Sequence, residues 1–431
     1  MTGFSRACAL AACAAAALAH AQPTVKCPEP APDDAQCYGA ADANGALVLF
    51  VVPARWNGVL VVNAHDGPDT KPPNVERHAD DLNRWSIFVK AGYAWADTTY
   101  RRAGYAVRNA AEDLVNARKL FPPGLPTPRR TLLQGEGWGA LVAARAIELY
   151  PRSFDGALLT SGELAGATRA EDYRLDLRVI YQYYCRNLPR PDEPQYPPWM
   201  GLPPGSKLTS ADVRVRFNEC TGSNLPAPRR SAAQREALVA ILAAARVPER
   251  TLPTQLARAV LVIADLVNRV LGGRSPFSNS GVEYRGTRDD RALNAGVARF
   301  AADPAARAEL AADADPTGRV EIPVLTLHAI ADPDTFVENE TVYRATLERA
   351  GTAEHLVQVY TDEAEHHDLS KSESMAALDA LLDWVERGKK PTPADIQAAC
   401  RPLVARYDEP CRVMPAYRPG AWDTRVYPRR P

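Results

Sequence analysis

The sequence of 431 residues carries almost no net charge, because 51 lysines and arginines are matched by 52 aspartates and glutamates. Binding to nucleic acid or to an anionic membrane surface needs concentrated positive charge, so neither is an expected partner. Long hydrophobic runs are also missing. Beyond the N-terminal segment no stretch reaches about 18 uninterrupted apolar residues, so no membrane span is expected.

Metal-binding spacings are missing as well. The chain has 8 cysteines and 7 histidines, but no histidine is interleaved with the cysteines at the spacing of a zinc site. The sequence therefore predicts no metal site, and no cofactor is expected.

The first 21 residues have the pattern of an export signal. Arg6 supplies a weak positive charge, Ala7–Ala19 is apolar, and Ala19–Ala21 is an A-x-A cleavage site. We therefore expect a periplasmic or secreted bacterial protein. The stretch Leu10–Cys13 also resembles a lipobox, which leaves a lipid anchor on Cys13 as an alternative.

The cysteines that follow this signal support export. Six remain, and an even number in an oxidising compartment predicts disulfides. Sequence alone does not fix the connectivity. The simplest pairing joins neighbours along the chain: Cys27 with Cys37, Cys185 with Cys220, and Cys400 with Cys411.

The most informative stretch runs from Thr131 to Tyr150. Thr131–Gln134 is typical of the end of a buried strand, and Gly135–Gly139 is too rich in glycine for anything but a sharp turn. Apolar residues at helical spacing follow. Strand, tight glycine turn and helix are the setting of a nucleophile elbow, G-x-S-x-G. Glycine, Gly137, stands where the serine belongs.

Three more motifs each follow a predicted strand. They are Ala64–Gly67, Ala331–Pro333 and Glu365–His367. With the elbow between the first and the second of them, these motifs resemble those of the α/β-hydrolase superfamily in kind and in order. The resemblance is greatest to secreted bacterial serine esterases or peptidase-like members with a helical cap. The resemblance implies an α/β fold with a mostly parallel twisted sheet, helices on both faces and a mainly helical cap insertion.

The resemblance also implies a catalytic site. Asp332 takes the position of the acid and His366 that of the base, while Gly137 is a vacant nucleophile position. Asp334 and His367 remain as alternatives for the acid and the base.

An oxyanion hole completes that site. The resemblance places its two peptide N–H donors at Asp66, or its neighbour Gly67, and at Trp138. Ser161, at the end of the following strand, is a remote candidate for a substitute nucleophile.

The chain divides into six expected parts. They are a signal peptide (1–21), an irregular N-terminal segment (22–45), the first part of the core (46–163), a helical cap (164–319), the second part of the core (320–390) and a Pro- and Arg-rich tail (391–431).

The function depends on Gly137, since a residue without a side chain cannot form an acyl-enzyme. We expect an exported protein of an ester or peptide hydrolase lineage, with hydrolysis weak or lost and a small ester, acid or peptide as its ligand. It is either a pseudoenzyme or a hydrolase that uses His366 as general base on water. On this view Gly137→Ser restores esterase activity.

A different class of function is also open. Gly135–Ala140 matches G-x-G-x-x-[GA], and Glu163 ends the next predicted strand as a ribose-binding acid does. A dinucleotide site would leave Asp332 and His366 unexplained, and bulky Trp138 stands where the pyrophosphate approaches the backbone.

Overall fold

A computed structural model of the chain describes residues 23–429. The expected signal peptide, and with it Cys13, lies outside the described residues. None of the helices within 23–429 is long and apolar enough to cross a bilayer.

The core is one sheet of nine strands in the order β1-β2-β3-β5-β4-β6-β7-β8-β9. All strands from β4 to β9 pair in parallel with their neighbours among them, and β3 pairs antiparallel with β5. From β2 onward this is the strand order of the α/β-hydrolase fold, and the predicted fold class is confirmed. The strands are β1 (Thr24–Val25), β2 (Gln36–Ala41), β3 (Leu47–Val52), β4 (Val59–Ala64), β5 (Ala94–Thr98), β6 (Arg130–Glu136), β7 (Gly156–Thr160), β8 (Val324–Ala329) and β9 (Leu356–Thr361).

Helices cover both faces of the sheet, and alternation along the strands explains how. In β4, Val59 and Val61 pack into one hydrophobic cluster, whereas Leu60 and Val62 pack into the other. The first cluster lies against α1, α11 and α12, and the second against α2, α3 and α10. These helices are α1 (Glu76–Lys90), α2 (Val107–Lys119), α3 (Trp138–Leu149), α10 (Asn339–Ala350), α11 (Lys371–Arg387) and α12 (Pro393–Tyr407).

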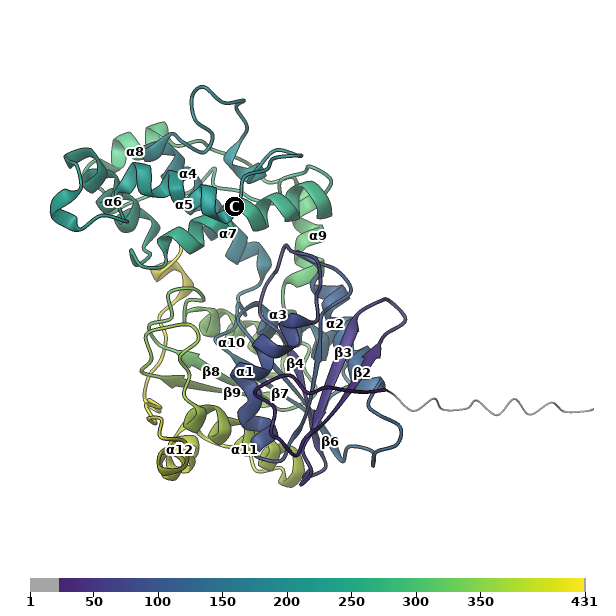
Figure 1. Ribbon diagram of the computed structural model, residues 1–431. Helices are drawn as coiled ribbons and strands as arrows, with labels where there is room; N and C mark the ends of the chain where they lie inside the picture. Colours follow the sequence, from purple (N-terminus) through teal and green to yellow (C-terminus); the bar gives the residue numbers. More distant parts are fainter. Residues whose placement is uncertain (1–22, 430–431) are drawn as a thin grey trace, which may run out of the picture.

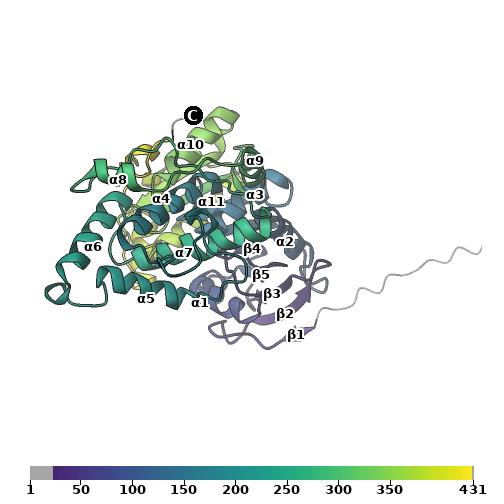
Figure 2. The ribbon, with the colours of Figure 1, turned by 90° about the horizontal axis from the view of Figure 1, so that it is seen from above.

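A helical layer is inserted between β7 and β8, within the range expected for the cap (Figure 1). Seen from above, strands β1 to β3 lie to one side of it (Figure 2). Its helices are α4 (Ala167–Cys185), α5 (Ser210–Thr221), α6 (Ala232–Ala245), α7 (Leu252–Asp265), α8 (Asp290–Gly296) and α9 (Pro304–Ala314). Shorter turns are the 3-10 helices Pro198–Met200, Ala227–Arg229, Ala353–His355 and Trp422–Thr424 and the π-helix Leu266–Val270.

The two ends of the chain are more regular than their composition predicts. The segment 22–45, expected to be irregular, contains β1 and β2, because β2 pairs along its whole length with β3 and so satisfies its backbone groups. The tail beyond residue 390 contains α12, which starts with a capping box at Thr392 and Asp395 and packs on α11. In both places tertiary contacts outweigh a composition rich in proline.

The three predicted cysteine pairs are bonded in the structure: Cys27–Cys37, Cys185–Cys220 and Cys400–Cys411. The second pair closes a loop of 35 residues within the cap, between the end of α4 and α5.

We expect no alkylation of these six cysteines in the unreduced, denatured protein and alkylation of all six after reduction, as measured by intact mass. Replacing both Cys185 and Cys220 by serine should lower the free energy of unfolding by about 3–4 kcal/mol, because the unfolded chain gains the entropy of an open loop. Alkylation without reductant would contradict the pairing.

Candidate active site

Four loops meet at the carboxyl edge of the parallel strands. They follow β4, β6, β8 and β9, and they carry Asp66, Gly137, Asp332 and His366. Parallel strands end on the same side of a sheet, so residues far apart in the sequence gather there. The cap, which leaves the sheet after β7, reaches the same edge, since Arg258 of α7 donates a 2.6 Å hydrogen bond to the carbonyl of Gly67.

The turn between β6 and α3 has the geometry of a nucleophile elbow. Gly137 has φ 55° and ψ −121°, a conformation that costs a residue with a side chain of order 1–3 kcal/mol. Gly139 is required for another reason, because a Cβ there would collide with the carbonyl oxygen of Ala64 in β4. The turn thus has the backbone of the expected elbow, with Gly137 at its tip.

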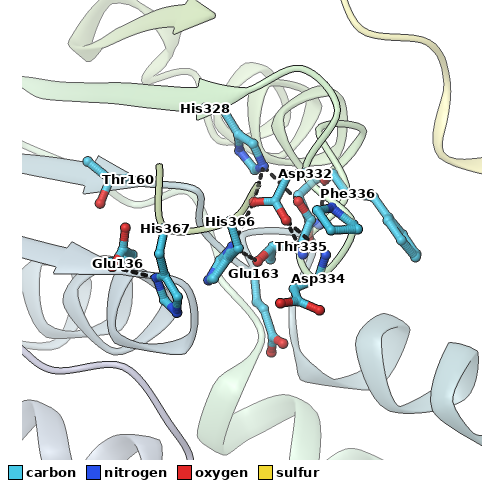
Figure 3. Close-up of polar contacts among 12 residues, drawn as sticks. Glu136, Thr160, Glu163, His328, Asp332, Asp334, Thr335, Phe336, His366 and His367 are labelled. Carbon is cyan, nitrogen blue, oxygen red and sulfur yellow. Dashed lines mark hydrogen bonds and ion pairs between the residues drawn. The ribbon is translucent and has the colours of Figure 1, made fainter. Parts of the chain in front are cut away.

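Asp332 and His366 form a buried pair at the ends of β8 and β9 (Figure 3). Nδ1 of His366 lies 2.7 Å from Oδ2 of Asp332, and Thr335 Oγ1 lies 2.9 Å from the same nitrogen. Oδ1 of Asp332 accepts the backbone N–H groups of Asp334 and Thr335. The imidazole is therefore oriented as in a catalytic triad, with Nε2 turned away from the acid.

Charges around this pair decide its protonation. Burial favours neutral imidazole, but the carboxylates of Asp332, Asp66 and Glu136 outweigh it and raise the pKa of His366 to about 10. Burial would likewise raise the pKa of Asp332, but His366, His328 and the Thr335 N–H keep it below its usual value. At neutral pH the pair is an imidazolium and a carboxylate.

The side chain of Asp66 fills the space where a nucleophile would stand. A Cβ on Gly137 would lie 2.5 Å from Oδ1 of Asp66 and 2.8 Å from Nε2 of His366. Oδ1 of Asp66 also accepts the backbone N–H of Trp138 at 2.8 Å, and Oδ2 lies 4.0 Å from His366 Nε2. The carboxylate therefore lies at the expected nucleophile position and binds one of the expected oxyanion donors.

Cations hold Asp66 in its charged form. Burial alone would raise the pKa of its carboxyl, but His366 and Arg258 overcome this effect and the pKa lies below its usual value. The backbone of Asp66 is fixed as well, since its carbonyl accepts hydrogen bonds from Arg77 and the ring of His65. His65 in turn packs against the ring of Tyr100, with centroids 4.1 Å apart.

His367 belongs to a second carboxylate–histidine pair. Its Nδ1 lies 3.1 Å from Oε2 of Glu136, the residue before Gly137 (Figure 3). Arg84 of α1 bonds to Glu136 and donates a 2.8 Å hydrogen bond to the carbonyl of His367. The His366 and His367 rings lie 4.5 Å apart, so the two pairs stand side by side.

A cleft of about 400 Å³ opens beside these residues. Asp66, Glu136 and His367 line it, together with Arg77 and Arg84. A small ligand in this cleft would touch both negative carboxylates and positive guanidinium groups.

The alternative residues have other partners. The carboxylate of Asp334 accepts a hydrogen bond from Gln255 rather than facing His366. Ser161 is fully buried, and within the described residues its hydroxyl makes no hydrogen bond to His366 or to any other group. Glu163, the acid of the dinucleotide alternative, forms an ion pair with Arg174. The Trp138 N–H at the start of α3, where a phosphate would bind, is donated to Asp66.

Sequence reasoning missed three contributions to the site. It considered only the peptide N–H of Asp66, whereas the carboxylate is the group that enters the site. It also overlooked Thr335 and the partnership of Glu136 with His367. The sequence held a signal for the Glu136–His367 pair, since Glu136 adjoins Gly137 and His367 adjoins His366.

The chain has the α/β-hydrolase fold. No family model matches it, and no curated protein sequence does either. Solved structures with a similar fold include lipase A of Candida antarctica, with 13% identity over 84% of this chain and 79% of the lipase and a TM-score of 0.44. An esterase from Aspergillus oryzae has 12% identity over 83% of this chain and 80% of the esterase, with a TM-score of 0.39. An esterase from Pyrococcus furiosus has 10% identity over 86% of this chain and 91% of the esterase, also with a TM-score of 0.39.

The raised pKa of His366 should make the stability of the metal-free protein depend on pH. The pKa of a histidine in the unfolded chain is about 6.5, so stabilisation by His366 is complete below about pH 6.5 and is lost as the pH rises toward about 10. Histidine NMR in EDTA should show the imidazolium of His366 well above pH 7. Asp332→Asn should lower this pKa and flatten the loss of stability between pH 6.5 and 10 in urea unfolding.

His355→Ala serves as the control, since that histidine lies outside the site, in the turn before β9. An unchanged pKa of His366 in Asp332→Asn would contradict the assignment of the pair.

Proposed function

We propose that this chain is an exported member of an ester or peptide hydrolase lineage in which the serine route to hydrolysis is closed. It keeps the site for a small ester, acid or peptide ligand. The single observation that carries the proposal is the place of the Asp66 carboxylate, 2.5 Å from the position of a Cβ on Gly137.

Acyl transfer through a serine needs an attacking hydroxyl and donors for the oxyanion. Gly137 provides no hydroxyl, and the Trp138 N–H is already donated to Asp66. A substrate oxyanion in that position would stand beside a carboxylate, and like charges at such a distance repel strongly. The missing hydroxyl at residue 137 and the occupied N–H of Trp138 therefore both oppose hydrolysis through a serine.

Direct general-base attack by water is less compatible with the geometry. A base must be unprotonated to accept a proton, but the three carboxylates around His366 hold its imidazole in the protonated form, with a pKa of about 10. Binding is therefore better supported than turnover by His366.

The proposal changes the design of a restoration experiment. Gly137→Ser alone should remain unlabelled by a fluorophosphonate, because the new side chain meets the Asp66 carboxylate, and it should lose roughly 1–3 kcal/mol of stability at the strained elbow. Adding Asp66→Ala removes that carboxylate and frees the Trp138 N–H. The double variant should be labelled and should hydrolyse activated short-chain esters after a small retreat of the His366 ring.

Two further variants make this test specific. In the double variant, His366→Ala should abolish labelling whereas His367→Ala should leave it intact, because only His366 is paired with Asp332. Labelling of the parent protein would show that another nucleophile operates and would overturn the proposal. All reactions are run in EDTA, so that no metal contributes.

A further inference from the structure

Three side chains at the site form a set of metal ligands. Asp66, His366 and His367 each offer one ligand atom, and these atoms lie within 4.8 Å of one another. Two imidazoles and a carboxylate are the ligands that divalent zinc takes in catalytic sites, where a fourth position stays open. The three residues come from the loops after β4 and β9, so no spacing along the chain predicts the set.

Each of the three ligands is also oriented by a partner behind it. Nδ1 of His366 is bonded to Asp332, and Nδ1 of His367 to Glu136, which leaves both Nε2 atoms without a hydrogen bond within the described residues. Carboxylate–histidine pairs of this kind fix the ring and make the free nitrogen a better ligand. The carboxylate of Asp66 is held through Oδ1 by the Trp138 N–H, and its Oδ2 is the oxygen nearer to His366.

The glycine at the elbow leaves room for an ion. Any side chain on Gly137 would begin 2.5 Å from Asp66 Oδ1 and 2.8 Å from His366 Nε2, between two of the ligands. The absence of a side chain at residue 137 therefore removes a nucleophile and at the same time lets these groups face one another.

The distances require a modest closure. Zinc bonds of about 2.0–2.2 Å put neighbouring ligand atoms roughly 3.3–3.5 Å apart, so the present separations must shrink by on the order of 1 Å. His366 is buried and bonded to Asp332, whereas the side chains of His367 and Asp66 are 51% and 22% exposed and can move toward it. Asp66 and His367 also line the 400 Å³ cleft, which gives an ion a path from solvent.

We propose that Asp66, His366 and His367 bind one divalent transition-metal ion, zinc above all, beside Gly137. Glu136 and Asp332 are positioning residues that act through the two imidazoles. The open coordination position faces the cleft and takes water or the carboxylate oxygen of a ligand, so among the ligand classes of the proposed function it favours a small acid or a peptide carboxyl end. This choice of ligand rests on the proposed function, whereas binding of the ion does not.

The test uses the tag-free mature protein, stripped of metal with EDTA and dialysed. Titration with Zn²⁺ by calorimetry should give one ion per chain, and Co²⁺ should give the intense visible bands of four-coordinate cobalt. Asp66→Asn and His367→Ala should each weaken Zn²⁺ binding at least about 100-fold, and Glu136→Gln about 10- to 100-fold. Asp69→Asn, in the same loop as Asp66, and His355→Ala should bind as the parent does.

Melting curves of the metal-free variants establish that each one folds; His367 is half-exposed, so its loss should leave the melting temperature unchanged. Failure of the parent to bind one equivalent of Zn²⁺ would overturn the proposal. So would parent-like affinity in both Asp66→Asn and His367→Ala. Fluorophosphonate labelling, run in EDTA, tests closure of the serine route independently of these outcomes.

Discussion

The site depends on one hydrogen bond, from the N–H of Trp138 to the carboxylate of Asp66. In an acyl-transferring hydrolase this donor lies at the start of the helix after the nucleophile and stabilises negative charge that appears during the reaction. Here the negative charge is permanent and belongs to the protein. The N-terminus of α3 stabilises it further, as helix N-termini stabilise anions in general. The N–H that binds a transient charge in such hydrolases makes a permanent structural contact here.

The fold around that contact is independent of it. The sheet order, the sharp turn at Gly137 and the close approach of Gly139 to β4 are set by packing of strands and helices. Glycine at 137 even relieves the elbow of backbone strain that a serine would introduce. A glycine at residue 137 is therefore neutral or favourable for stability, so the architecture does not require a side chain there.

Sequence predicted the fold well because its strongest signals are local. The glycines of the elbow and the apolar runs of β4 and β8 fix strand and turn within a few residues, and the order of motifs gave the pairing of Asp332 with His366. What could not be predicted depends on side chains meeting across the sheet edge. In the sequence Asp66 is only a loop residue, and its approach to Gly137 is seen only in the structure. Strand β2 is likewise recognisable only through its pairing with β3.

Three carboxylates surround His366, and each of them has a cationic or hydrogen-bonding partner. Asp332 and Glu136 each pair with one of the two adjacent imidazoles, and Arg84 bonds to Glu136. His366 and Arg258 keep Asp66 in its charged form. The negative charge beside Gly137 is therefore held in place by the protein, and a serine added at residue 137 would leave it there. An oxyanion formed at that serine would still meet the carboxylate of Asp66 and be repelled by it.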